Sequence, residues 1–167
     1  MTRALLVIDI QNDYFAGGAL PLWQPEETEA RVVSAIGRAR ADGDRIILVR
    51  HVSLAPTGPF VAGSTGADIR QAILDAAGNT PLVTKHYADA FQETALVDQL
   101  AGVSELLITG MMTQNCVVFT ALSRAADGLR VRIVGDLCTA PTEVVHRIAL
   151  NALGSKVEVA TAADVWA

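Results

Sequence analysis

The sequence predicts a three-layer α/β/α sandwich around a mostly parallel six-stranded sheet. Two observations predict it. Six short aliphatic, β-branched runs recur along the chain, as is typical of strands that are buried on both faces. Segments with helical spacing lie between most of them, and right-handed crossovers between parallel strands then place helices on both faces of a sheet. The six runs cover residues 4–10, 45–52, 81–85, 105–111, 131–138 and 156–160.

The clearest predicted helix covers residues 25–42. Its apolar side chains recur on one side, its first turn is acidic and its last turn carries Arg38 and Arg40, so the charges complement the helix dipole. Gly43 then ends it. Further helices are predicted over residues 93–101, 113–127 and 141–153. Residues 12–24 and 53–66 resist regular assignment, and loops that follow strands in this way usually build sites.

Length and composition exclude several classes of protein. The 167 residues suit a single domain over residues 1–167. A net charge of -5 without any basic run excludes a nucleic-acid or anionic-membrane partner, and no apolar run approaches the ~18 residues of a membrane span. The two cysteines, Cys116 and Cys138, do not form a C-x-x-C pair, which indicates a reducing compartment. We therefore expect a cytoplasmic protein with a small-molecule substrate.

Three polar residues lie at or after the ends of predicted strands. Asp9 interrupts an apolar run, where a carboxylate is costly unless it is paired; it either ties down a loop or takes part in chemistry. Lys85 ends the third strand and is either a surface cation or a compact partner for a buried carboxylate. Cys116 follows the fourth strand and is either a packing residue or a nucleophile. With Thr113 as N-cap, it falls in the first turn of a helix, where the pKa of a thiol is lowered.

The predicted topology brings these three residues together. Asp9, Lys85 and Cys116 follow the first, third and fourth strands, and a doubly wound sheet gathers those strand ends around its switch point. A carboxylate, an ammonium and a thiol in one pocket supply a proton acceptor, an electrostatic anchor and a nucleophile. The joint arrangement therefore favours chemistry more strongly than any one residue does.

These residues resemble the isochorismatase-like cysteine hydrolases, a Rossmann-like superfamily that includes nicotinamidases, N-carbamoylsarcosine amidases and streptothricin hydrolases. The resemblance extends over nearly the whole chain, and its three main blocks occur in the right order on the right strands. It rests on residues 7–15 (VIDIQNDYF), residues 85–91 (KHYADAF), residues 110–116 (GMMTQNC), and Asp136 near the end of the fifth strand.

The resemblance implies the site and its chemistry. The family's catalytic triad falls on Asp9, Lys85 and Cys116, a non-proline cis peptide is implied between Met111 and Met112, and the amides of Met112 and Cys116 form an oxyanion hole. It implies that Asp9 takes the thiol proton, that Cys116 attacks an amide-type carbonyl, and that water hydrolyses the resulting thioester. No cofactor is implied.

The histidines argue against a metal site. Metal-binding nicotinamidases carry Asp-x-His after the second strand with further histidines in the next loop, whereas here His51 stands alone until His86. We therefore expect no metal ligands, and an amide other than nicotinamide. His51 either hydrogen-bonds in the loop or contacts substrate, and His146 is expected on a helix face. Asp136 is expected to fix a loop.

The few aromatic residues point to a substrate pocket. Only 5% of residues are aromatic, yet most of them follow the first three strands, where they would overhang the site. We expect a small, partly apolar acyl or ring-bearing substrate, although the sequence does not name it. A mean hydropathy of +0.35 together with the resemblance predicts a homo-oligomer, a dimer or larger. The residues expected to bind substrate are Tyr14, Phe15, Trp23, Phe60 and Phe91.

Two other functions are considered for a chain of this fold class. A nucleotide enzyme is disfavoured because neither G-x-G-x-x-G nor G-x-x-x-x-G-K-[ST] occurs in the chain. A catalytically idle binding protein, or a thiol-redox sensor that uses Cys116, keeps the same fold without turnover. The presence of all three residues of the triad argues against this second rival but does not exclude it.

Overall fold

The sheet is six-stranded, and every neighbouring pair of strands in it is parallel. The structure is a computed structural model that describes residues 2–167. Its strands run in the order β3-β2-β1-β4-β5-β6, which reverses direction at β1, and sites in such sheets open at the carboxyl ends of the strands there. The strands are β1 (Arg3–Ile8), β2 (Arg45–His51), β3 (Leu82–Lys85), β4 (Glu105–Met111), β5 (Arg130–Thr139) and β6 (Glu158–Ala160).

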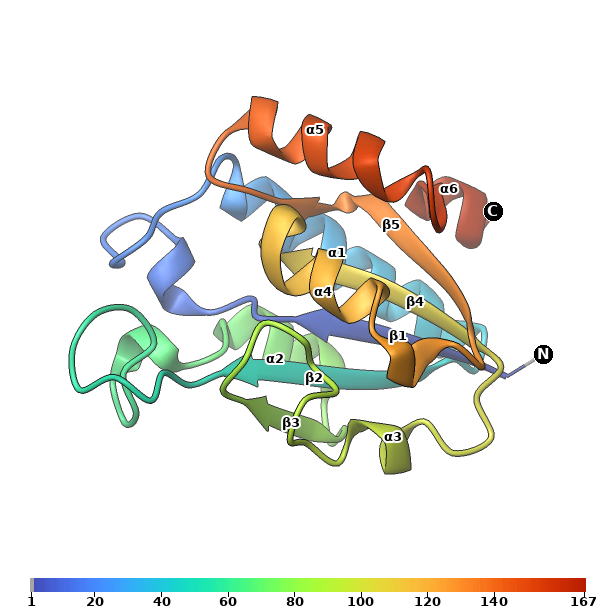
Figure 1. Cartoon of the computed structure of the whole chain (residues 1–167), viewed down its shortest axis with the longest axis horizontal. Coiled ribbons are helices and arrows are strands. Elements are labelled where there is room, and N and C mark those ends of the chain that lie inside the picture. The colour runs from blue at the N-terminus through green and yellow to red at the C-terminus, as the bar shows by residue number, and fades with distance from the viewer. Residues whose placement is uncertain (1) are drawn as a thin grey trace.

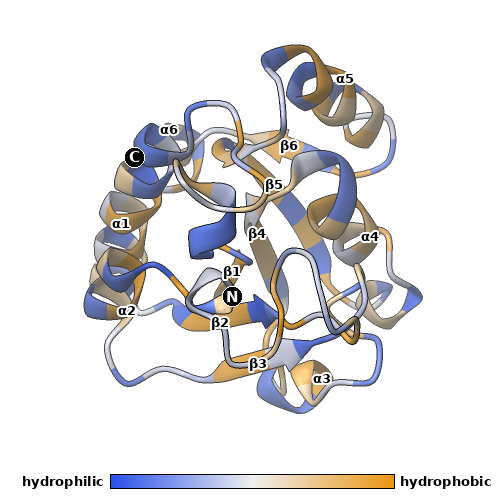
Figure 2. Ribbon diagram, turned by 90° about the vertical axis from the view of Figure 1, so that its left-hand side faces the viewer, coloured by the Kyte–Doolittle hydropathy of each residue, from blue (hydrophilic) through white to orange (hydrophobic). Residues whose placement is uncertain are grey.

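Helices cover both faces of this sheet, which confirms the predicted three layers (Figure 1). Figure 2 looks onto the carboxyl ends of the strands and shows α1, α2 and α6 to one side of the sheet, with α4 and α5 on the other. The first group comprises α1 (Pro25–Ala41), α2 (Gln71–Ala77) and α6 (Ala162–Val165). The second comprises α3 (Leu96–Gln99), α4 (Val118–Ala121) and α5 (Glu143–Leu153).

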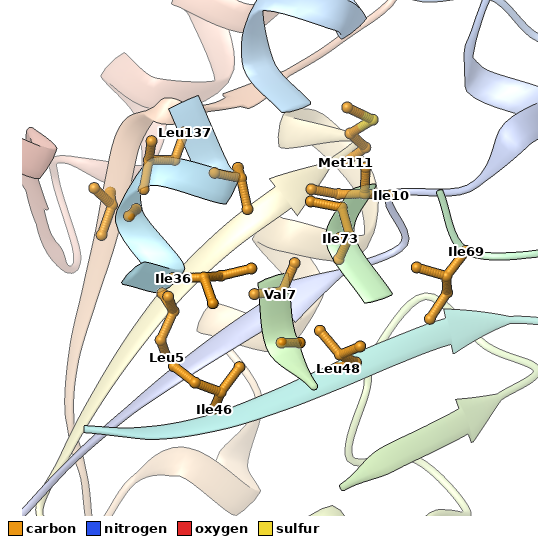
Figure 3. Close-up of a cluster of buried hydrophobic side chains, with 14 of the residues drawn as sticks. Leu5, Val7, Ile10, Ile36, Ile46, Leu48, Ile69, Ile73, Met111 and Leu137 are labelled. Atoms are coloured by element: carbon orange, nitrogen blue, oxygen red, sulfur yellow. The ribbon is translucent and has the colours of Figure 1, made fainter. Parts of the chain in front are cut away.

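The core is aliphatic on both faces because successive strand residues point to opposite sides. Leu5 and Val7 of β1 pack toward α1 and α2, together with Ile36 and Ile73 from those helices (Figure 3). Leu6 of β1 packs into the cluster on the opposite face. Each such side chain contributes about 1.5–3 kcal/mol when it is fully buried. This double burial explains why the strands read as unbroken apolar runs.

A glycine allows the ends of β1 and β4 to approach closely. Gly110 of β4 has a φ of +119°, and a Cβ at that position would lie 2.0 Å from the carbonyl oxygen of Ile8. β1 itself ends at Ile8, two residues earlier than predicted, because Asp9 turns into the left-handed region with a φ of +52°. The residue that follows β1 is therefore held in an uncommon conformation beside β4.

We expect Gly110→Ala to destabilise the protein by at least about 4 kcal/mol, since both its φ and the clash with Ile8 forbid a side chain. Gly37 offers a matched control. It is exposed within α1, and a Cβ there meets nothing within 4 Å, so Gly37→Ala should stabilise by about 0.5–1 kcal/mol. Urea unfolding of both variants tests this, and equal stabilities would contradict it.

Two predicted helices are much shorter than expected. The helix predicted over residues 93–101 is reduced to α3, because Glu93 has a φ of +56° and cannot be helical. The helix predicted over residues 113–127 is divided into a π-helical turn (Thr113–Val117), α4 and a 3-10 turn (Arg124–Ala126). The division after α4 occurs because Ser123 is extended and caps the 3-10 turn with its side chain.

Other elements were missed by the sequence analysis. α2 and α6 were not predicted, and the two irregular segments contain 3-10 turns at Asn12–Tyr14 and Thr65–Ala67. β5 extends one residue beyond the predicted run at each end, and its pairing with β4 shifts register between Ile108 and Gly110. Among residues 2–167, no helix has the length and apolarity needed to cross a membrane.

Candidate active site

Three polar side chains meet at the carboxyl ends of the central strands. Asp9 follows β1, Lys85 ends β3, and Cys116 lies in the π-helical turn after β4. Lys85 Nζ lies 2.8 Å from Asp9 Oδ2 and donates to Cys116 Sγ at 3.2 Å. Asp9 and Lys85 are fully buried and Cys116 is 3% exposed. The three residues that the strand order was predicted to gather therefore do lie together, and we refer to them as the polar cluster.

Lysine is suited to its place because β3 is two strands away from β1. Neighbouring strands lie about 4.8 Å apart, so a side chain from β3 must span roughly 10 Å across the end of β2 to meet Asp9. On the way, Lys85 Nζ contacts His51 Nδ1 at 3.1 Å, and it also donates to the Tyr87 carbonyl at 3.0 Å. The ammonium is thus surrounded by acceptors without any exposure to solvent.

Burial and neighbouring charges shift the pKa values of Lys85 and Cys116. Burial lowers the pKa of Lys85, but Asp9 and Cys116 outweigh burial and raise it above its ordinary value, so Lys85 stays protonated. Burial and the Asp9 carboxylate raise the pKa of Cys116 to about 12, and Lys85 only partly offsets them. The lowered thiol pKa expected from a helix terminus is therefore wrong. Cys116 rests as a thiol whose proton needs an acceptor.

The turn that carries Cys116 is built differently from the prediction. Met112, not Thr113, occupies the N-cap position, and the Val117 amide donates to the Met112 carbonyl at 3.3 Å. Thr113 is not a cap because its Oγ1 is hydrogen-bonded to His146 Nδ1 at 2.8 Å. The peptide bond between Met111 and Met112 is cis, at the position that the resemblance implied. π-helical turns are rare and occur frequently at functional sites.

His146 is the residue near the site that the sequence analysis undervalued. It does lie on α5, but on the buried side, where it contacts Thr113 and the ring of Trp23 at a centroid distance of 5.9 Å. Burial, Arg147 and Arg31 lower its pKa. Spacing on α5 could have indicated its burial, since His146, Ala149 and Leu153 recur at helical intervals. Its partner in another element could not have been predicted.

The residues after Asp9 fix the loops over the site. Gln11 Nε2 donates to the carbonyls of His51 and Ala67, both at 2.7 Å, while its Oε1 accepts from the His51 amide at 2.9 Å. Asp13 accepts from the amide of Phe60 at 2.7 Å and from that of Ala19 at 3.0 Å. These polar side chains therefore brace the loop that follows Asp9. They join residues 12–24 to residues 53–66 beside the polar cluster.

Two of the five predicted aromatic residues pack together near the polar cluster. The rings of Tyr14 and Phe60 pack edge-on at 4.8 Å, and Phe60 packs on His51 at 5.7 Å. Burial raises the pKa of Tyr14 well above its ordinary value, and the charges of Asp9 and Cys116 raise it further. Their expected role in substrate binding stays a prediction.

The other three aromatic residues lie elsewhere. Phe15 is buried in the core beneath the Arg70 guanidinium, which is 4.1 Å from its ring centroid. Trp23 is half-buried against His146. Phe91 packs beside α3 and lines a cavity of about 280 Å³ with Leu100 and other apolar residues. None of these contacts involves the polar cluster, so their expected role in substrate binding stays a prediction.

Asp136 and Cys138 have contacts that are structural and lie outside the polar cluster. Asp136 Oδ1 accepts from the Ala162 amide at 2.9 Å, which fixes the start of α6. Cys138 is buried in the core and donates to the Val134 carbonyl at 3.5 Å, and burial raises the pKa of its thiol to about 12. Within residues 2–167, no three or more His, Cys, Asp or Glu side chains are grouped so that they could hold a metal ion.

Comparisons with known proteins agree with the observed fold. Residues 3–164 match the family model described as the isochorismatase domain. The chain is 34% identical to the uncharacterized isochorismatase family protein YddQ of Bacillus subtilis (85% of this chain, 80% of that protein) and 27% identical to the nicotinamidase of Escherichia coli (81% and 82%). The solved structure of an isochorismatase family protein from Desulfovibrio vulgaris superposes with a TM-score of 0.87 at 26% identity, covering 98% of this chain and 96% of that one.

Proposed function

The chain belongs to the isochorismatase family, and we propose that it is a cysteine hydrolase that cleaves a small amide-type carbon–nitrogen bond through a thioester on Cys116. One observation carries the proposal: Cys116 Sγ lies 3.2 Å from Lys85 Nζ, which lies 2.8 Å from Asp9. A nucleophile, a cation and a base in mutual contact are what acyl transfer requires. The relative from Escherichia coli is by its name an amide hydrolase, which supports cleavage of the same class of bond.

In the first half of the proposed reaction, Asp9 takes the proton of Cys116 and the sulfur attacks the carbonyl carbon. The Cys116 pKa of about 12 makes this proton transfer necessary, because little free thiolate exists at neutral pH. The amides of Met112 and Cys116 stabilise the oxyanion of the tetrahedral intermediate. Asp9 then gives its proton to the departing nitrogen, so that the C–N bond breaks and a C–S thioester remains.

In the second half, Asp9 takes a proton from water, whose oxygen attacks the thioester carbon. The C–S bond breaks, the acid leaves, and Asp9 returns the proton to sulfur. Lys85 keeps its charge throughout, since Asp9 and Cys116 hold its pKa above the ordinary value. Its function is to stabilise whichever of the two partners is negative at each step.

We propose that this hydrolysis needs no metal or other cofactor and that the substrate is not nicotinamide. The donor set supports the absence of a metal. Nδ1 of His51 already faces the Lys85 ammonium at 3.1 Å, so a metal ion bound to His51 would be repelled by the charge of Lys85. Tyr14 and Phe60 supply a wall for a small, partly apolar acyl group or ring.

A substrate screen tests the proposed function. Amides, carbamoyl compounds and nitriles are incubated with the protein, with and without EDTA, and release of ammonia or amine is measured. We expect at least one compound to be hydrolysed at a rate that EDTA does not change. The rival, an idle or thiol-redox protein, predicts no hydrolysis of any compound together with peroxide sensitivity that is lost in Cys116→Ala.

We also propose that the protein is a homo-oligomer. Large apolar side chains stay exposed on α4 and α5: Phe119 (55%), Leu122 (48%), Val144 (65%) and Ile148 (64%). Exposed apolar side chains of this size on adjoining elements are typical of an interface between subunits. Light scattering at micromolar concentration should give at least twice the chain mass of 17.6 kDa, whereas the mass of a monomer would contradict the proposal.

A cytoplasmic location is proposed from the cysteines. Both Cys116 and Cys138 are free thiols in the structure. A reducing compartment would keep the proposed nucleophile in the thiol form, whereas an oxidising one would expose it to disulfide exchange or sulfenic acid formation.

A further inference from the structure

His51 lies where the Lys85 side chain crosses from the edge of the sheet to its centre. It ends β2, which lies between β3 and β1, and it is paired in register with Lys85. Residues paired in a parallel ladder point to the same face, so the imidazole lies beneath the lysine stem as that stem runs toward Asp9. The resulting contact joins Lys85 Nζ to His51 Nδ1 at 3.1 Å.

The hydrogen bonds of Lys85 show what His51 contributes. An ammonium has three N–H donors and no acceptor. Four acceptors share them: Asp9 Oδ2 at 2.8 Å, the Tyr87 carbonyl at 3.0 Å, His51 Nδ1 at 3.1 Å and Cys116 Sγ at 3.2 Å. Because Lys85 can only donate, Nδ1 of His51 must be the acceptor. The imidazole is therefore neutral and carries its hydrogen on Nε2.

Asp9 is the nearest of these four acceptors. Its Oδ2 lies 2.8 Å from Lys85 Nζ, which is hydrogen-bond distance for an ammonium and a carboxylate. Each further N–H that the ammonium gives to Asp9 stabilises the ionised carboxylate and makes it a weaker acceptor for a proton. If one lysine donor were released, Asp9 Oδ2 would be the nearest acceptor for it.

We propose that His51 is a positioning residue for the reaction: its neutral imidazole accepts one N–H of Lys85, so that Cys116 Sγ keeps a donor and Asp9 receives only part of the remainder. The inference rests on the proposed function of the polar cluster. Without the acceptor, the released N–H turns to Asp9 and makes the carboxylate a weaker acceptor for the thiol proton. Deprotonation of Cys116, and with it acylation, becomes slower.

The surroundings of His51 hold the ring in this role. Gln11 fixes its backbone on both sides, and the edge of Phe60 packs on the ring. The titratable groups that act on it are Lys85, Asp9 and His86; burial and the Lys85 charge lower its pKa below the ordinary value of 6.5. The neutral form therefore predominates at neutral pH. As pH falls through this lowered pKa, the acceptor is lost and two cations face each other.

The test uses p-nitrophenyl acetate, an activated ester, so that acylation of Cys116 can be followed without knowledge of the natural substrate. His51→Leu removes the acceptor and should slow acylation on the order of 10- to 100-fold, as loss of a group that orients a reactive residue commonly does. His51→Asn keeps an acceptor near the position of Nδ1 but cannot be protonated there. It should restore most of the rate and should lack the fall in rate at acid pH that we expect of the unmodified protein.

His86→Asn is the matched control. This second histidine also acts on His51, but its own Nδ1 is bonded to the Val52 carbonyl at 2.8 Å and does not contact Lys85. We expect it to keep the rate and the fall in rate at acid pH. The inference is overturned if His51→Leu acylates at the unmodified rate, or if His51→Asn is as slow as His51→Leu. If instead Cys116→Ala reacts as fast as the unmodified protein, the proposed function itself fails.

Discussion

Cys116→Ala is expected to abolish turnover, with a fall in kcat of roughly 10⁴-fold or more, as for removal of other catalytic nucleophiles. The sulfur is the one nucleophile in the polar cluster, since Lys85 stays protonated and Asp9 is the base in the proposed reaction. Cys116 is a buried member of the core, but the substitution removes only one sulfur atom, so stability should fall only slightly. Activity assays with the amide found by screening, or with p-nitrophenyl acetate, measure the loss.

Cys138→Ala is the control for this substitution. Cys138 is as deeply buried as Cys116 and its thiol pKa is also raised to about 12, but its hydrogen-bond partners are the backbones of Val134 and Gly110 and not the polar cluster. We expect this variant to keep its activity. Iodoacetamide should label Cys116 ahead of Cys138, because only Cys116 has a neighbouring base and cation. Full activity of Cys116→Ala would contradict the proposed mechanism.

Removal of one partner of the Asp9–Lys85 pair should destabilise the fold by about 3–5 kcal/mol, because the other charge is then buried without compensation. Lys85→Met and Asp9→Asn each remove one charge, and the double variant removes both. We expect the double variant to lose much less stability than the sum of the two single losses. All three variants should be inactive. The double variant should therefore lose activity while it keeps most of its stability.

The comparison is made by urea unfolding, with an exposed ion pair as control. Arg147 and Glu143 on α5 lie 2.6 Å apart but are largely exposed, and Arg147→Met should change the free energy of unfolding by less than about 1 kcal/mol. Additive losses for Asp9→Asn and Lys85→Met would show that the two charges do not stabilise each other. The polar cluster would then be a geometric coincidence.

The sequence predicted the sheet and the meeting of the polar cluster because both follow from burial. Strands covered on both faces read as apolar runs, and Asp9 and Lys85 stand out as charges at the ends of such runs. Once the strands are parallel, their carboxyl ends lie at one edge, so residues far apart in the chain meet there. Periodicity and topology are enough for this step.

Features set by single long-range contacts could not be predicted in this way. The turn around Cys116 departs from an ordinary helix start, with Thr113 hydrogen-bonded to His146 from α5 in place of a capping bond. The helix expected from Glu93 is shortened by one left-handed residue. The lowered thiol pKa was wrong because burial and Asp9 outweigh the effect of a helix terminus. Each outcome depends on a neighbour that local sequence does not specify.

The most direct test of the central claim is to look for an acyl group on Cys116. The protein is mixed with p-nitrophenyl acetate, quenched in acid and analysed by mass spectrometry of the intact chain and of its peptides. The account predicts one acetyl group per chain, located on Cys116, released by hydroxylamine and absent from Cys116→Ala. An acetyl group on Lys85 or elsewhere, or ester hydrolysis that continues in Cys116→Ala, would contradict it.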